Sequence, residues 1–190
     1  MEFRGSRTER NLIATFAGES QARTRYSFFS SAAKKEGFEQ ISSIFQETSD
    51  NEKEHAQLFF NHLKGGNVEV AATYPAGVIA STLENLKAAA DGEKLEWGTL
   101  YPEFAQIAQE EGFSDVALAF RMVAQVEIYH ERRYRKLVAN VEQGRVFKKD
   151  SPIKWKCRNC GYVFESTDTP EKCPVCTHPR SYFEVWCENY

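Results

Sequence analysis

Glu52-Lys53-Glu54-His55 recurs 75 residues later as Glu127-Ile128-Tyr129-His130, and this repeated stretch decides the fold. In an α-helix, residues three positions apart are neighbours, so each glutamate and its histidine can reach one metal ion or a closely spaced pair. Both pairs lie within apolar stripes of helical spacing, where a bare carboxylate costs several kcal/mol unless positive charge compensates it. The stretch therefore predicts helices that carry metal ligands on their buried faces.

The repeat extends outward from these two segments with the same shift. The matching positions, first copy then second, are Tyr26 and Tyr101, Phe29 and Phe104, Phe45 and Phe120, and the turns Glu36-Gly37-Phe38 and Glu111-Gly112-Phe113. Glu19 falls one residue from Glu93. The first 145 residues thus predict two copies of a helical hairpin, whose pseudo-two-fold axis brings the Glu-x-x-His pairs face to face.

Apolar periodicity and turn residues predict four helices, and hence a mainly α protein with a four-helix bundle. We expect the helices to run from a capping box at Ser6 and Glu9 to Gly37, over 38–64, from near Gly92 onward, and over 114–143. The connection 67–91 is long enough for a crossover, and a short helix is expected after Pro75. Pro102 should kink or loosen the third helix, because proline removes a backbone hydrogen bond.

One glutamate from each of two helices, with a Glu-x-x-His pair from each of the others, is the ligand pattern of a di-iron or di-manganese carboxylate site. The candidate ligands are Glu19, Glu52, His55, Glu93, Glu127 and His130. Glu96 is a further candidate, although it lies one step off the apolar stripe. Tyr26 and Tyr101 lie about two turns from Glu19 and Glu93, where hydrogen bonds to ligands are expected.

The five cysteines all follow residue 156, and four of them form two Cys-x-x-Cys pairs with twelve residues between. The pairs are Cys157 with Cys160 and Cys173 with Cys176, which predicts a tetrahedral four-thiolate metal site. So short a segment buries little core, so the metal must help it fold. The spacing permits zinc or a single iron.

The shift in composition near residue 150 predicts two domains, 1–148 and 152–190, in a chain of 190 residues. The net charge of -3 argues against a dedicated nucleic-acid binder. The sequence contains no run of 18 apolar residues, so it predicts no membrane span. The charged N-terminus is unlike a signal peptide. We therefore expect a cytoplasmic protein.

Taken together, these motifs resemble the rubrerythrin family over essentially the whole chain. The resemblance rests on Ala17-Gly18-Glu19-Ser20-Gln21-Ala22-Arg23, both Glu-x-x-His pairs, Gly92-Glu93-x-x-Glu96, and Trp155-x-Cys157-x-x-Cys160-Gly161-Tyr162. It implies a ferritin-like four-helix bundle with an oxo- and carboxylate-bridged non-haem di-iron site. It also implies a small, β-rich, rubredoxin-like domain that holds one iron in a four-cysteine site.

The resemblance further implies a peroxidase of class EC 1.11.1 that reduces hydrogen peroxide to water and protects against oxidative stress. Electrons would come from an NAD(P)H-dependent reductase or a separate rubredoxin, through the protein's own rubredoxin centre. Glu52 and Glu127 would bridge the irons, and Glu96 and His55 would exchange as ligands of one iron. A head-to-tail homodimer would bring the rubredoxin centre of one chain to the di-iron site of the other.

Two alternatives belong to other functional classes. The bundle alone is compatible with a ferroxidase or iron-storage protein of the ferritin kind, although such a protein has no need of a fused electron relay. A regulatory or structural zinc-ribbon protein explains the cysteines but leaves the in-register buried glutamates unexplained.

Overall fold

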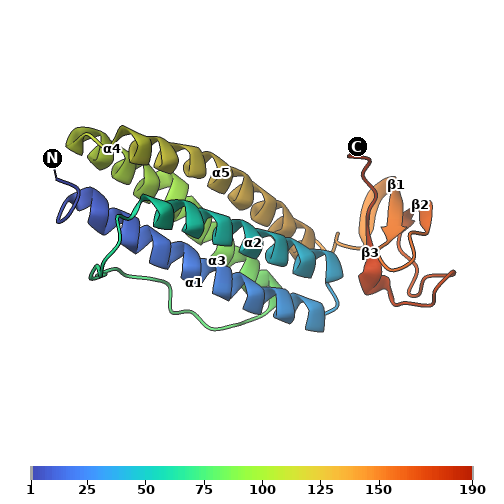
Figure 1. Ribbon diagram of the computed structural model, residues 1–190. Coiled ribbons are helices and arrows are strands. Elements are labelled where there is room, and N and C mark those ends of the chain that lie inside the picture. The colour runs from blue at the N-terminus through green and yellow to red at the C-terminus, as the bar shows by residue number, and fades with distance from the viewer. Residues whose placement is uncertain (1, 190) are drawn as a thin grey trace.

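The computed structural model describes residues 2–189 and shows a long helical bundle with a small stranded domain at one end (Figure 1). The helices are α1 (Arg7–Lys35), α2 (Glu39–His62), α3 (Thr82–Leu95), α4 (Tyr101–Glu111) and α5 (Ser114–Glu142), with a π-helical turn, η1 (Glu96–Leu100), between α3 and α4. Because α3, η1 and α4 are continuous, they form the third helix of the bundle. The predicted mainly α four-helix architecture is confirmed.

The helix ends follow local capping chemistry. The Ser6 side chain accepts the N–H of Glu9 at the start of α1, as predicted. The Glu9 carboxylate accepts the N–H of Gly5 instead of that of Ser6, so the capping box is only half formed. Gly37 follows α1 with φ 84, a left-handed conformation that glycine adopts at low cost.

The predicted start of the third helix was wrong. Helix α3 begins at Thr82, well before Gly92, because Ser81 and Glu84 form a complete capping box. The helix expected in the connection after Pro75 begins at Thr82 as the first part of α3, so it is not a separate short helix, and residues 67–80 have no regular secondary structure. This segment runs back along the bundle as the predicted crossover (Figure 1), and the Tyr74 hydroxyl donates a hydrogen bond to the carbonyl of Ala14 at 2.6 Å.

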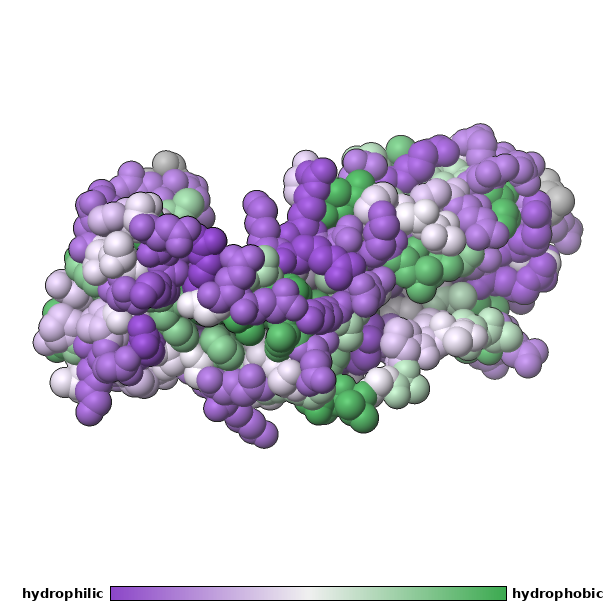
Figure 2. All heavy atoms as spheres, turned by 180° about the vertical axis from the view of Figure 1, so that it is seen from behind, coloured by the Kyte–Doolittle hydropathy of each residue, from purple (hydrophilic) through white to green (hydrophobic). Residues whose placement is uncertain are grey.

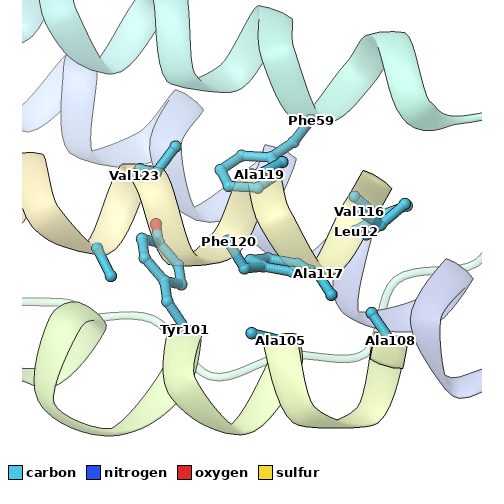
Figure 3. Close-up of a cluster of buried hydrophobic side chains, with 11 residues drawn as sticks. Leu12, Phe59, Tyr101, Ala105, Ala108, Val116, Ala117, Ala119, Phe120 and Val123 are labelled. Carbon is cyan, nitrogen blue, oxygen red and sulfur yellow. The ribbon is translucent and has the colours of Figure 1, made fainter. Parts of the chain in front are cut away.

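The apolar core is divided into two clusters along the bundle. One surrounds Phe59, Tyr101 and Phe120, whose side chains meet from α2, α4 and α5 (Figure 3), with the rings of Phe59 and Phe120 stacked at 4.9 Å. The other includes Phe45 and Tyr134, again from α2 and α5. Both Glu-x-x-His segments lie between these clusters in sequence, so the polar layer lies between two hydrophobic ones.

The C-terminal domain is a three-stranded antiparallel sheet of order β2-β1-β3. Its elements are β1 (Lys148–Cys157), β2 (Val163–Asp168), the short 3₁₀ helix η2 (Arg180–Tyr182) and β3 (Phe183–Val185). Trp155 is fully buried, and its indole N–H donates to the carbonyl of Ser166. Arg158 hydrogen-bonds to Ser43 of α2, so the domain contacts the end of the bundle.

Strand β1 crosses the predicted boundary between 148 and 152, and that division stays a prediction. Within residues 2–189, no helix combines the length and the apolar character that crossing a membrane requires.

Candidate metal centres

Six of the side chains predicted as ligands converge in the middle of the bundle as two overlapping groups. The groups are Glu19, Glu52, His55 and Glu127, and Glu52, Glu93, Glu127 and His130. Within each group, one potential ligand atom per residue lies within 4.8 Å of all the others. Glu52 and Glu127 belong to both groups, so they occupy the positions from which carboxylates can bridge two ions.

Each histidine directs its Nδ1 atom toward both shared glutamates. His55 Nδ1 lies 2.8 Å from an oxygen of Glu52 and 2.9 Å from one of Glu127. His130 Nδ1 lies 2.7 Å from the other oxygen of Glu127 and 3.3 Å from that of Glu52. The repeat therefore produces a nearly symmetrical arrangement of two imidazoles about two carboxylates.

Several buried donor and acceptor atoms here make no well-directed hydrogen bond among residues 2–189, although the two imidazoles form close ion pairs with the oxygens of Glu127 and Glu52. The atoms without such a hydrogen bond are Glu19 Oε2, Glu52 Oε1, Glu93 Oε2, both oxygens of Glu127, and His130 Nδ1. Leaving such groups unsatisfied in a buried site is costly, whereas metal ions supply the missing positive charge and coordination. The residues present thus fit a pair of metal ions.

Without metal, the site balances its charge by holding protons. Burial opposes ionisation of Glu127, but His130 and His55 outweigh it and lower its pKa to about 2. Burial lowers the pKa of the imidazoles, but Glu127 and Glu52 outweigh it and raise the pKa of His55 to about 10 and that of His130 to about 12. Because a ligating imidazole must be neutral, metal ions have to displace these protons.

Two tyrosines donate hydrogen bonds to the two glutamates that belong to only one ligand group each. The Tyr26 hydroxyl on α1 donates to Glu93 on α3 at 2.5 Å, and the Tyr101 hydroxyl on α4 donates to Glu19 on α1. Burial and then the adjacent carboxylate raise the pKa of each tyrosine well above its ordinary value. Both phenols therefore stay protonated and act as hydrogen-bond donors to the carboxylates.

The π-helical turn explains why the repeat slips by one residue. Tyr101 follows Tyr26 by 75 residues, whereas Glu93 follows Glu19 by 74. Turn η1 lies between Glu93 and Tyr101, and its wider winding absorbs one additional residue. The turn ends at Leu100, two residues before Pro102, which cannot donate the usual helical hydrogen bond, so the predicted loosening of this helix takes the form of a π turn.

Glu96 begins this turn and lies outside both groups of potential ligands. Its side chain is nevertheless turned inward: burial, and then the charges of Glu93, Glu127 and Glu52, raise its pKa well above the ordinary value. The π turn, which the apolar stripe did not reveal, accounts for the inward position of a residue one step off that stripe.

Two residues near the site were missed by the sequence analysis. Asn51 places its Oδ1 atom 3.3 Å from His130 Nε2, where it can fix the orientation of the ring. Asn51 corresponds to Val126 in the repeat, so the repeat gave no signal for it. Arg25 is the positive charge that partly offsets the raised pKa of Glu96.

The four cysteines of the two knuckles converge in the C-terminal domain. Their sulfur atoms lie within 4.8 Å of one another, and the Sγ atoms of Cys157 and Cys176 are 3.7 Å apart. The backbone N–H of His178 lowers the pKa of the Cys176 thiol to about 6. At Cys160 the backbone N–H of Tyr162 acts in the same direction, but burial and the neighbouring thiols outweigh it and raise the pKa to about 12. Thr177 has φ 61, the left-handed conformation that Gly161 adopts in the first knuckle.

Comparison with known proteins agrees with both sites. Residues 10–138 match the family model Rubrerythrin, and residues 155–184 match that of the rubrerythrin rubredoxin-like domain. Rubrerythrin from Porphyromonas gingivalis is 57% identical, with 98% of this chain and 94% of that protein covered. Rubrerythrin from Nitratidesulfovibrio vulgaris is 52% identical, with 98% of each chain covered. A structure of mixed-valence nigerythrin aligns with a TM-score of 0.63 at 31% identity, covering 96% of this chain and 87% of that one.

The fold and the two sites define a ferritin-like di-iron carboxylate protein with a rubredoxin-like four-cysteine iron domain. Within that class, the chain belongs to the rubrerythrin family. The predicted fold class, cofactors and family resemblance are thereby confirmed.

Proposed function

We propose that this protein is a non-haem di-iron peroxidase that reduces hydrogen peroxide to water in the cytoplasm, as part of protection against oxidative stress. One observation carries the proposal: a buried site with two shared glutamates lies in the same chain as a separate four-thiolate site. The first arrangement suits two-electron chemistry, and the second suits the return of electrons one at a time. An iron-storage protein has no use for the second site.

The overall reaction needs two electrons and two protons for each peroxide, and it yields two water molecules. Two ferrous ions, held in this site, would supply the two electrons. Glu52 and Glu127, which are at most 1% exposed, would hold that pair inside the bundle. Tyr26 and Tyr101 hold protons next to Glu93 and Glu19, so they can steady carboxylates that shift during turnover.

Glu96 and His55 are proposed to exchange as ligands of one iron. The support is that His55 contacts both shared glutamates while Glu96 is set back in a π turn, a helix irregularity often found at functional sites. Glu96→Ala should retain the iron but lower peroxidase turnover at least about tenfold, the effect of losing roughly 1.4 kcal/mol of stabilisation. Glu103→Ala, an exposed glutamate of α4, is the matched control. Unchanged turnover in Glu96→Ala would contradict the exchange.

A second copy of the chain is the proposed partner for electron transfer. The chain's own C-terminal domain contacts α2 at Ser43, which lies about 18 Å along that helix from His55, so the domain meets the bundle at a distance from its own histidines. Over α2 and α5, a cavity of about 690 Å³ extends from Val185 of the chain's own β3 to His130 and Asn51, and exposed Val126 and Tyr129 line it. A head-to-tail dimer would place the partner's rubredoxin-like domain over this histidine face.

The surface is consistent with such contacts. Hydrophobic areas interrupt the mostly hydrophilic surface of the bundle, and the outline is hollowed between the bundle and the C-terminal domain (Figure 2).

Mixing a Cys157→Ser chain with a Glu127→Gln chain tests the proposed head-to-tail dimer. A head-to-tail dimer predicts that the mixture regains donor-driven turnover that neither variant shows alone, and no recovery after subunit exchange would contradict it.

The peroxidase proposal itself is tested with a reductase system that supplies electrons from NAD(P)H through a rubredoxin. The wild-type protein should consume peroxide continuously, and Cys157→Ser should oxidise its di-iron site once and then stop. The iron-storage alternative instead predicts uptake of many more than three irons per chain and no dependence on the cysteine site.

A further inference from the structure

A cavity of about 500 Å³ approaches the glutamate layer from the face opposite the histidines. It lies between α1, the crossover segment 71–75 and the helix formed by α3, η1 and α4, and we call it the access cavity. Its lining includes Glu96 and Tyr101, the second of which donates a hydrogen bond to Glu19. The cavity therefore reaches groups that contact the di-iron ligands.

Unsatisfied polar groups line the α1 wall of the access cavity. Thr15 is only 5% exposed, and its hydroxyl has no hydrogen-bond partner in the described chain, residues 2–189. Asn11 is half-buried, and its buried Nδ2 atom also has no hydrogen-bond partner among these residues. Asn11, Thr15 and Glu19 are spaced by four, so they share one face of α1 and form a polar row that ends at an iron ligand. Such a row is unfavourable in a dry cavity and suits small molecules that donate and accept hydrogen bonds.

Two glycines, one on α1 and one on α3, leave space beside the ligands. Gly18 and Gly92 line the cavity directly before Glu19 and Glu93 in sequence, and neither places a side chain in it. The Tyr74 ring packs against Gly18, and its hydroxyl is anchored to Ala14, so the crossover forms a fixed cover over the passage. An opening of this kind admits small molecules and excludes bulky ones.

We propose that the access cavity is the passage by which hydrogen peroxide, and the water that carries its protons, reach the di-iron site, with Asn11 and Thr15 hydrogen-bonding the molecules in transit. This inference rests on the proposed peroxidase function. The proposed routes for substrate and electrons are then separate. Substrate enters between α1 and the third helix, and electrons enter at the histidine face between α2 and α5.

The test measures access independently of peroxide turnover. Azide binding to the oxidised, iron-loaded protein is followed by stopped-flow absorption, and peroxide reduction is measured alongside it. Thr15→Val removes the hydroxyl at nearly constant shape, and Ala72→Trp narrows the passage from its exposed crossover side. Thr24→Val, an exposed threonine on the same helix, is the matched control.

We expect Thr15→Val to slow azide association about fivefold, the factor for one hydrogen bond of about 1 kcal/mol. Ala72→Trp should slow it at least about tenfold, and Thr24→Val should stay within about twofold of wild type. Azide rates within twofold of wild type in both passage variants would overturn the proposal. Should Thr15→Val lose iron, Ala72→Trp alone decides in the same way. Slowed azide binding in a protein that does not reduce peroxide would support the passage and refute the peroxidase function.

Discussion

Loading iron into the bundle should release at least two protons per chain at pH 7. In the metal-free site, burial lowers the pKa of the two imidazoles, but Glu127 and Glu52 raise it to about 10 for His55 and about 12 for His130. Each imidazole then carries a proton that it must lose to bind metal. Glu127, with a pKa of about 2, contributes none.

Three further carboxyls can add to the release. Burial raises their pKa well above the ordinary value, and they are Glu19, Glu93 and Glu96. The expected release is therefore between two and five protons, where a site made of normal carboxylates and neutral imidazoles at pH 7 would release close to none.

The assay adds ferrous ions anaerobically to protein whose four-cysteine site is already filled, in weak buffer with a pH indicator. His55→Gln should lower the proton yield by about one, and His62→Gln, outside both ligand groups, should leave it unchanged. A yield below two in the wild-type protein, with both irons bound, would refute the proposed electrostatics of the site.

Three other predictions follow from the same structure. Raising the pH from 6 to 9 should lower the melting temperature of the metal-free protein. The raised imidazole pKa values give stability that is complete below pH 6.5 and falls as the pH rises toward about 10 for His55 and about 12 for His130. A circular-dichroism melt that does not change between these pH values would contradict this. Cys157→Ser should lose the absorption of the four-cysteine iron and leave two irons per chain; three retained irons would argue against the assigned ligands. Phe59→Ala should lower the free energy of unfolding by about 3–5 kcal/mol in denaturant titration, against about 0.5 kcal/mol or less for exposed Phe60→Ala, since Phe59 is fully buried.

The sequence contained enough information to predict the bundle and most of the site because a buried charge is conspicuous on an apolar stripe. Glu52 and Glu127 interrupt regular hydrophobic spacing on long helices, and the repeat places them in equivalent positions. Helix periodicity then determines that each histidine lies beside its glutamate. The cysteine knuckles were equally clear, since their spacing alone determines a four-thiolate cluster.

The parts that sequence analysis missed depend on local irregularity. The start of α3 was placed too late although Ser81 and Glu84 carry a capping box, because the preceding connection is too polar and irregular for periodicity to mark its end. The inward position of Glu96 depends on the π turn, and helical periodicity assumes uniform winding. The one-residue offset between Glu19 and Glu93 was the available signal for that turn.

Metal analysis followed by anaerobic re-oxidation tests the central claim most directly. The protein should contain three irons per chain, two in the bundle and one in the cysteine site. After full reduction, the di-iron site should be oxidised faster by hydrogen peroxide than by oxygen. Zinc in the cysteine site of the native protein, or rapid oxidation by oxygen alone, would contradict the account.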